Sequence, residues 1–139
     1  MGPGHPERPE RLTAILKHLQ ASDLWPSLRL CEPKPVERTI LQLVHPPAYV
    51  ELIERACREG PVALDPDTIT SPGSWDAALR AVGAVTQAID EVVQGAVSAA
   101  FCMVRPPGHH ALANQAMGFC LFNNVAIGAR YAQQRHGVA

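Results

Sequence analysis

The 139-residue sequence lacks an excess of positive charge, because 12 Lys and Arg residues are balanced by 13 Asp and Glu residues and leave a formal net charge of −1. Proteins that bind nucleic acid need a basic surface to neutralise phosphates, so no direct nucleic-acid partner is expected. Cysteine is also sparse, and Cys31, Cys57, Cys102 and Cys120 form no close-spaced pair. This spacing does not indicate a zinc knuckle or a CxxC redox site, and we expect free, mostly buried thiols.

Long apolar runs are absent as well. No segment approaches the roughly 20 apolar residues that a membrane-spanning helix needs, so no membrane partner is expected. The first residues, Met1 to Arg8, have no apolar stretch after a basic flank and therefore do not resemble a signal peptide, which predicts a cytoplasmic protein. The sequence does have a globular composition, with 47% apolar and 18% charged residues, enough for one domain with a buried core.

Four segments show the apolar spacing of helices that bury one face. Proline and small polar residues stand at their starts, as is typical of helix N-termini. Ser74 is predicted to be the N-cap of the third and longest helix. The four helices are predicted to begin near Pro9, Pro46, Ser74 and Phe122.

Strand-like segments separate these helices. Residues 98–104 form a continuous apolar run, as expected of a strand inside a parallel sheet that has helices on both faces. A short strand is predicted at residues 28–31, and residues 138–139 look like the start of another strand. Residues 36–44 fit either a helical turn or a strand, and residues 62–73 are expected to form a loop. The alternation predicts an α/β fold, three α/β/α layers with a mostly parallel sheet, and the few strands predict that the sheet is incomplete.

The most informative segment follows the apolar run and contains the adjacent residues His109 and His110, preceded by Arg-Pro-Pro-Gly. In open α/β sheets ligands bind beyond the carboxyl ends of the strands, where this loop would lie. Two imidazoles titrate near neutral pH and can divide general-base and general-acid work. A tandem histidine can equally be solvated and inert, or belong to a hydrogen-bonded loop core, and the motif alone leaves these alternatives open.

Several segments together resemble the histone deacetylase family, including its bacterial members and the acetylpolyamine amidohydrolases. The most specific match is formed by residues 105–110 (RPPGHH) with residues 118–120 (GFC). Residues 5–12, 44–50 and 65–75 are similar to other segments of the family. The resemblance therefore covers nearly the whole chain.

This resemblance implies a fold of the arginase/deacetylase type and a zinc-dependent hydrolase that removes the acetyl group from a lysine side chain of a protein or from an acetylpolyamine. By the same resemblance His109 and His110 are the two catalytic histidines, one a general base and the other an acid or electrostatic partner. Gly118 and Phe119 would line the tunnel that binds the acyl-lysine stem. Asp65 would be the rim carboxylate that accepts the substrate's backbone N–H groups, although an aspartate before a proline is also a common turn residue.

The resemblance also implies that the zinc ligands are missing from this sequence. In the family they come from an Asp-x-Asp-x-His motif after the next strand and from a later Asp, and no Asp follows Asp90 here. The histidine pair is not among those ligands. Residues 1–139 are thus expected to be the N-terminal part of one deacetylase domain, truncated before the zinc-ligand motif and with negligible activity alone. The alternative is a non-catalytic fragment or remnant that needs a partner chain to fold, and the oligomeric state stays open.

Four residues near these motifs have simpler structural interpretations. His45 is expected to cap a helix rather than to bind a metal. Cys120 could pair with a histidine as a nucleophile, but a small buried thiol is the favoured interpretation. Asn123 and Asn124 could cap the last helix or hydrogen-bond the histidine loop, and the sequence does not decide between these roles.

Overall fold

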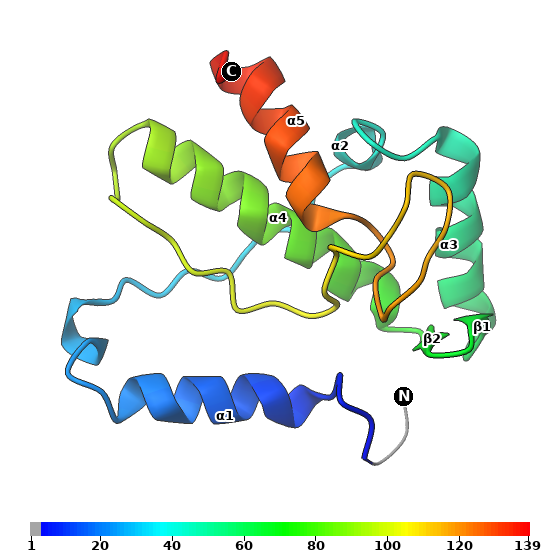
Figure 1. Cartoon of the computed structure of the whole chain (residues 1–139), viewed down its shortest axis with the longest axis horizontal. Helices are drawn as coiled ribbons and strands as arrows, with labels where there is room; N and C mark the ends of the chain where they lie inside the picture. Colours follow the sequence, from blue (N-terminus) through cyan, green and yellow to red (C-terminus); the bar gives the residue numbers. More distant parts are fainter. Residues whose placement is uncertain (1–3) are drawn as a thin grey trace. The chain divides into compact units, whose positions relative to one another are not determined.

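The computed structural model describes residues 4–139, and the chain divides into two compact units. The first unit ends at Glu32, and the second runs from Pro33 to Ala139 (Figure 1). Among the residues that the structure describes, no helix combines the length and the apolar character needed to cross a membrane.

The first unit is built around helix α1, Pro9–Gln20, followed by the short 3-10 helix η1, Trp25–Ser27. A proline in its first turn fits α1 because the missing N–H would have no partner there, and the carboxylate of Glu10 suits the positive end of the helix dipole. The helix predicted near Pro9 is confirmed. The strand predicted at residues 28–31 is wrong, because a strand requires a hydrogen-bonded neighbour and these residues belong to no strand.

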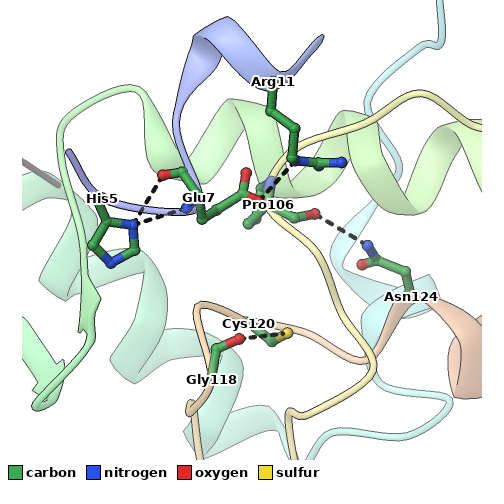
Figure 2. Close-up of polar contacts among 7 residues, drawn as sticks. All are labelled: His5, Glu7, Arg11, Pro106, Gly118, Cys120 and Asn124. Carbon is green, nitrogen blue, oxygen red and sulfur yellow. Dashed lines mark hydrogen bonds and ion pairs between the residues drawn. The ribbon is translucent and has the colours of Figure 1, made fainter. Parts of the chain in front are cut away.

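A small polar network precedes α1. The Nδ1 atom of His5 accepts the backbone N–H of Glu7 at 3.0 Å, and Nε of Arg11 donates to the Glu7 carboxylate at 3.1 Å (Figure 2). The second contact joins residues four apart, the spacing at which helical side chains meet. These bonds fix the local conformation of the chain as it enters α1.

The second unit contains four helices, and the three longer ones lie in segments that the sequence predicts to be helical. The three longer helices confirm the predictions made for their segments. Residues 36–44 contain the short helix α2, so the helical-turn alternative is the correct one for this segment. The four helices are α2 (Arg38–Leu41), α3 (Pro47–Glu59), α4 (Ser74–Val93) and α5 (Asn124–His136).

The start of α4 differs in one detail from the sequence prediction. Gly73 is the N-cap, and Ser74 is the first helical residue rather than the cap. The Ser74 hydroxyl accepts the backbone N–H of Ser71 at 2.9 Å, so this side chain closes the preceding turn instead of satisfying a helix N–H. The cap prediction is therefore wrong because the serine side chain has a local backbone partner outside the helix.

Helices α4 and α5 pack closely, and a glycine makes the approach possible. A Cβ atom at Gly128 of α5 would lie 2.6 Å from Val85 Cγ1 and 3.1 Å from Ile89 Cδ1 of α4. Apolar side chains from α2, α3, α4 and the segment before α5 continue this contact into one core. Its most completely buried large members are Phe122, Leu41, Ile53, Ile127, Val50 and Val82.

Residues 62–73, predicted as a loop, contain a small β-hairpin. Strand β1, Ala63–Asp65, pairs antiparallel with β2, Thr68–Ile69, at the carboxyl end of α3 (Figure 1). The Thr70 hydroxyl donates to the Ala56 carbonyl of α3 at 3.2 Å. The prediction missed the hairpin because its strands are too short to show a period-two pattern.

The apolar segment 98–104 belongs to no strand among residues 4–139, and neither do residues 138–139. Both predicted strands are wrong for this structure. A parallel strand needs neighbours for its backbone N–H and C=O groups, and the described residues form only the two-stranded antiparallel hairpin. The side chain of Phe101 is 71% exposed as a result. The second unit is a partial α/β fold, and the predicted parallel sheet is not formed by residues 4–139.

Asp90, in the last turn of α4, joins this helix to the second half of α5, because it accepts Tyr131 Oη–H at 3.0 Å and lies 2.6 Å from His136 Nε2. We expect Asp90→Ala to lower the free energy of unfolding by about 1–2 kcal/mol, since two partners lose their acceptor. Urea denaturation measures the change. The matched control is Asp76→Ala, which removes an exposed ion pair with Arg80 and should cost less than about 0.5 kcal/mol. Equal losses in the two variants would contradict this assignment.

Candidate active site

The segment of residues 105–123, named the histidine loop here, is anchored at the start of α5. The Asn123 side chain is the N-cap of α5, since its Oδ1 accepts the Ala126 N–H at 3.0 Å, and its Nδ2 donates to the Ala111 carbonyl at 2.9 Å. Asn124 Nδ2 donates to the Pro106 carbonyl at 3.4 Å (Figure 2). The two asparagines therefore fill both roles that the sequence left open, capping the helix and holding the loop.

Gly108 lets the loop approach α5 at a distance that no other residue permits. A Cβ atom at this position would lie 2.5 Å from the Asn124 backbone nitrogen and 2.7 Å from the Phe122 carbonyl oxygen. Backbone atoms cannot move aside as a flexible side chain can. The Pro-Pro-Gly sequence before the histidines thus places their backbone directly against the N-terminus of α5.

The other side of the loop is held by residues at the start of α3. His45 Nδ1 lies 2.8 Å from the Ala113 carbonyl oxygen, and its Nε2 lies 2.9 Å from the Asn123 backbone nitrogen. Tyr49 Oη–H donates to the Leu121 carbonyl at 2.7 Å. The expected helix cap is wrong, because the N-cap of α3 has no side-chain hydrogen bond and both ring nitrogens of His45 have partners in the loop.

A third anchor comes from the β-hairpin. The Thr68 hydroxyl, which is buried, accepts the backbone N–H of Phe119 at 2.9 Å. Gly118 and Phe119 both have a positive φ, at 56° and 68°, so the chain turns sharply here. Sequence reasoning missed Thr68 and the role of His45, because neither residue lies in a pattern that points to the loop.

The structure brings the predicted catalytic histidines together with the predicted tunnel glycine. The ring centroids of His109 and His110 are 4.2 Å apart at an interplanar angle of 48°, and both residues are exposed. A Cβ atom at Gly118 would lie 2.8 Å from three atoms of the His110 side chain. The His110 side chain therefore lies between the His109 ring and the turn at Gly118.

Asp65 lies at the tip of the hairpin and has a turn role. Its Oδ1 accepts the Asp67 backbone N–H at 3.0 Å, which is the local bond expected of an aspartate that initiates a turn. The hairpin contacts the histidine loop through Thr68 and Phe119. The turn interpretation of Asp65 is confirmed, and a role at the substrate rim stays a prediction.

The thiol near the histidines is buried and hydrogen-bonded. Cys120 is completely buried, and its Sγ donates to the Gly118 carbonyl at 3.2 Å (Figure 2), which confirms the buried-thiol interpretation. Cys57 is buried too, and burial together with the nearby Glu54 raises its pKa to about 11. Cys31 departs from the expectation of buried thiols because it is exposed.

The fit to a metal can be judged from the donor side chains. Among residues 4–139, no group of three or more His, Cys, Asp or Glu side chains could hold a metal ion. A catalytic zinc needs about three protein ligands. The residues present therefore do not fit a complete zinc site.

Replacing Gly118 by alanine tests the contact with His110. The variant carries the strain of a positive φ, about 1–2 kcal/mol, and also a methyl group 2.8 Å from the imidazole, which adds about 1–3 kcal/mol. Gly137→Ala is the matched control, because Gly137 has a φ of 65° and open space around its Cβ position. Urea denaturation should show a larger loss for Gly118→Ala, and equal losses would contradict the close contact.

The comparison with protein families decides the assignment. The model of the histone deacetylase domain matches residues 5–139. The chain belongs to the histone deacetylase family. The family shown by this match is the one that the RPPGHH and GFC motifs predicted.

Individual relatives agree with this assignment. The chain is 38% identical over 135 residues to the "Histone deacetylase-like amidohydrolase" of Pseudomonas aeruginosa, covering 97% of this chain and 36% of that protein. It is 41% identical over 138 residues to the human "Polyamine deacetylase HDAC10", covering 95% and 21% respectively. The chain thus spans well under half the length of these curated relatives.

A solved structure confirms the predicted fold class. The crystal structure of the HDA15 HD domain matches with a TM-score of 0.88 at 36% identity, over 94% of this chain and 38% of that chain. The described residues therefore form part of the α/β fold of that domain.

Proposed function

We propose that this chain supplies the histidine loop of a zinc-dependent deacetylase that hydrolyses the amide of an acetylated amine. The substrate class is an acetylated lysine side chain of a protein or an acetylated polyamine. The observation that carries the proposal is the pair of adjacent, exposed imidazoles, 4.2 Å apart, with Gly118 against one of them. Family membership supports the same chemistry.

In this proposal His109 and His110 move protons during amide hydrolysis. One neutral imidazole takes a proton from the attacking water, and the other, in its charged form, stabilises developing negative charge or protonates the leaving amine. Adjacent rings can divide these roles because a neutral imidazole accepts a proton and a protonated imidazole donates one. We propose that the zinc ligands are supplied by residues other than residues 4–139.

The turn at residues 118–119 is proposed to bind the aliphatic stem of the substrate. Gly118 gives the substrate access to backbone, and the Phe119 ring offers an apolar surface for a methylene chain. The Phe119 N–H bond to Thr68 holds this turn. Asp65, on the same hairpin as Thr68, is proposed as the rim carboxylate, with one carboxylate oxygen free of the turn bond available for a substrate N–H.

A chimaera tests this function. In it, the present chain replaces the matched 135-residue segment of the Pseudomonas amidohydrolase. We expect the chimaera to deacetylate an acetyl-lysine peptide or an acetylated polyamine, and the isolated chain with added zinc to show no turnover. A folded chimaera that is inactive on both substrates would contradict the proposal, as would turnover by the isolated chain.

A second candidate is a non-catalytic fragment that folds only with a partner chain. It is favoured by an apolar groove of about 310 Å³ formed by α4, α5 and residues 100–102, with Ile89, Cys102 and Val138 in its lining. An exposed groove of this kind reduces the stability of an isolated chain. A cooperative thermal melt of the monomeric chain would contradict this second candidate.

A further inference from the structure

We propose that His45 is a positioning residue for the histidine loop, and that it holds the loop only as the neutral imidazole, so that acid loosens the loop. The inference rests on the proposed function, in which the loop carries the proton-transfer pair. His45 itself lies 64 residues before His109 in the sequence and is 1% exposed, so it is shielded from solvent.

The hydrogen-bond partners of His45 define its protonation state. The Asn123 backbone N–H can only donate, so Nε2 of His45 must accept with its lone pair. The Ala113 carbonyl can only accept, so Nδ1 must bear the hydrogen. Only the neutral ring with its hydrogen on Nδ1 satisfies both partners, and these partners lie at two separate points of the loop.

These bonds lead to His110 through Asn123. His45 holds the Asn123 backbone, and the Asn123 side chain donates to the carbonyl of Ala111, the residue after His110. The Ala111 N–H donates in turn to the Gly108 carbonyl at 3.3 Å, which closes a turn around the two catalytic histidines. The aromatic rings of Tyr49 and Phe122, each 5.2 Å from His45 between centroids, keep the imidazole in place.

Protonation of His45 would break this arrangement. A second ring N–H would face the Asn123 N–H, and a charge would be placed in an apolar enclosure. Burial lowers the pKa of His45 below 6.5, and the bond to the Ala113 carbonyl offsets part of that effect. When the loop is loosened, His45 regains its ordinary pKa and therefore binds a proton more readily than it does in the anchored loop. The anchored loop is thus fully favoured above pH 6.5 and loses stability as the pH falls below that value.

Among residues 4–139, His45 contacts two backbone groups and two aromatic rings, and none of these partners is charged. Tyr49, in the first turn of α3, keeps its proton because it donates to the Leu121 carbonyl and because burial raises its pKa. On the loop side, the Cys120 thiol interacts with Tyr49 and donates to the Gly118 carbonyl. We therefore attribute the loss of the hydrogen bond between the Asn123 N–H and His45 in acid to protonation of the His45 imidazole.

Amide hydrogen exchange of the full 139-residue chain, measured at pH 7.5 and pH 5.0 and expressed as protection factors, tests the proposal. In the wild type we expect the protection of Asn123 and Ala111 to fall about 10-fold or more at pH 5.0, since a buried hydrogen bond is lost. The Val50 amide, which donates to the Pro46 carbonyl in α3, should remain protected and so report that the unit is still folded.

Two variants separate positioning from a general structural role. His45→Gln keeps one donor and one acceptor without a titratable ring, so Asn123 protection should survive and lose its pH dependence. His45→Phe should lack Asn123 protection at both pH values. His18→Gln, at an exposed histidine of α1, is the matched control and should respond to pH as the wild type does.

The proposal is overturned if wild-type Asn123 protection is absent at pH 7.5 or equal at the two pH values. It is also overturned if His45→Gln keeps the wild-type pH response or loses Asn123 protection at pH 7.5. Because exchange involves no turnover, these outcomes are independent of the deacetylase assay. An inactive chimaera would contradict the proposed function but would not affect the exchange result for the histidine loop.

Discussion

Replacing His109 or His110 by alanine is expected to lower the deacetylation rate of the chimaera by about 10²–10⁴-fold, the usual contribution of a positioned general acid or base. Each variant removes one of two adjacent rings, and the remaining imidazole cannot take up and deliver the proton at the same time. Both side chains are exposed, so their loss should leave the fold unchanged. The effect should appear mainly in kcat, measured with an acetyl-lysine peptide.

The double variant and a distant histidine provide the controls. If the two imidazoles act as a unit, removing both should cost little more than removing one. His18→Ala, in α1, should retain the activity of the unmodified chimaera. Variants at His109 and His110 that keep full activity would show that the pair is solvated and inert, the alternative that the sequence left open.

Phe122→Ala is expected to lower the free energy of unfolding of the isolated chain by about 3–5 kcal/mol, a large part of the stability of a typical domain. The side chain is 1% exposed, and its ring contacts those of His45, Tyr49 and Trp75 at centroid distances of 5.2–6.0 Å. Truncation would leave a cavity where the histidine loop packs against His45 and Trp75. Urea denaturation followed by circular dichroism measures the loss.

Phe101→Ala is the matched control for this prediction. Phe101 is 71% exposed, so its truncation should change the unfolding free energy by less than about 0.5 kcal/mol. Similar losses at the two positions would contradict the placement of Phe122 at the centre of the core.

The helices could be predicted from the sequence because their apolar periodicity is local. The hydrogen bonds of a helix join residues close in sequence, and α3 buries the face that its apolar spacing indicates. The faces predicted for the other two helices are less accurate: α4 buries Val82 but leaves Val92 39% exposed, and α5 buries Ile127 while Val125 is 66% exposed. Strands depend on partners elsewhere. The apolar run 98–104 has the composition of a buried strand, but the described residues offer it no neighbouring strand.

The candidate site was predictable only in part, for the same physical reason. Adjacent histidines after a Pro-Pro-Gly turn are visible in the sequence, and a family resemblance adds Gly118 and Phe119. The anchors of the loop are not visible, because Asn123 binds a histidine 78 residues away and Phe119 binds a threonine 51 residues away. Such contacts arise from tertiary packing, and no local sequence pattern at His45 or Thr68 predicts them.

A crystal structure of the zinc-loaded chimaera, with data collected at the zinc absorption edge, tests the central claim most directly. The claim is that His109 and His110 transfer protons and do not hold the metal. We predict a zinc ion whose protein ligands all come from the Pseudomonas part, with both imidazoles nearby but beyond ligand distance. A ring nitrogen of His109 or His110 at about 2.0–2.1 Å from the zinc would contradict the account.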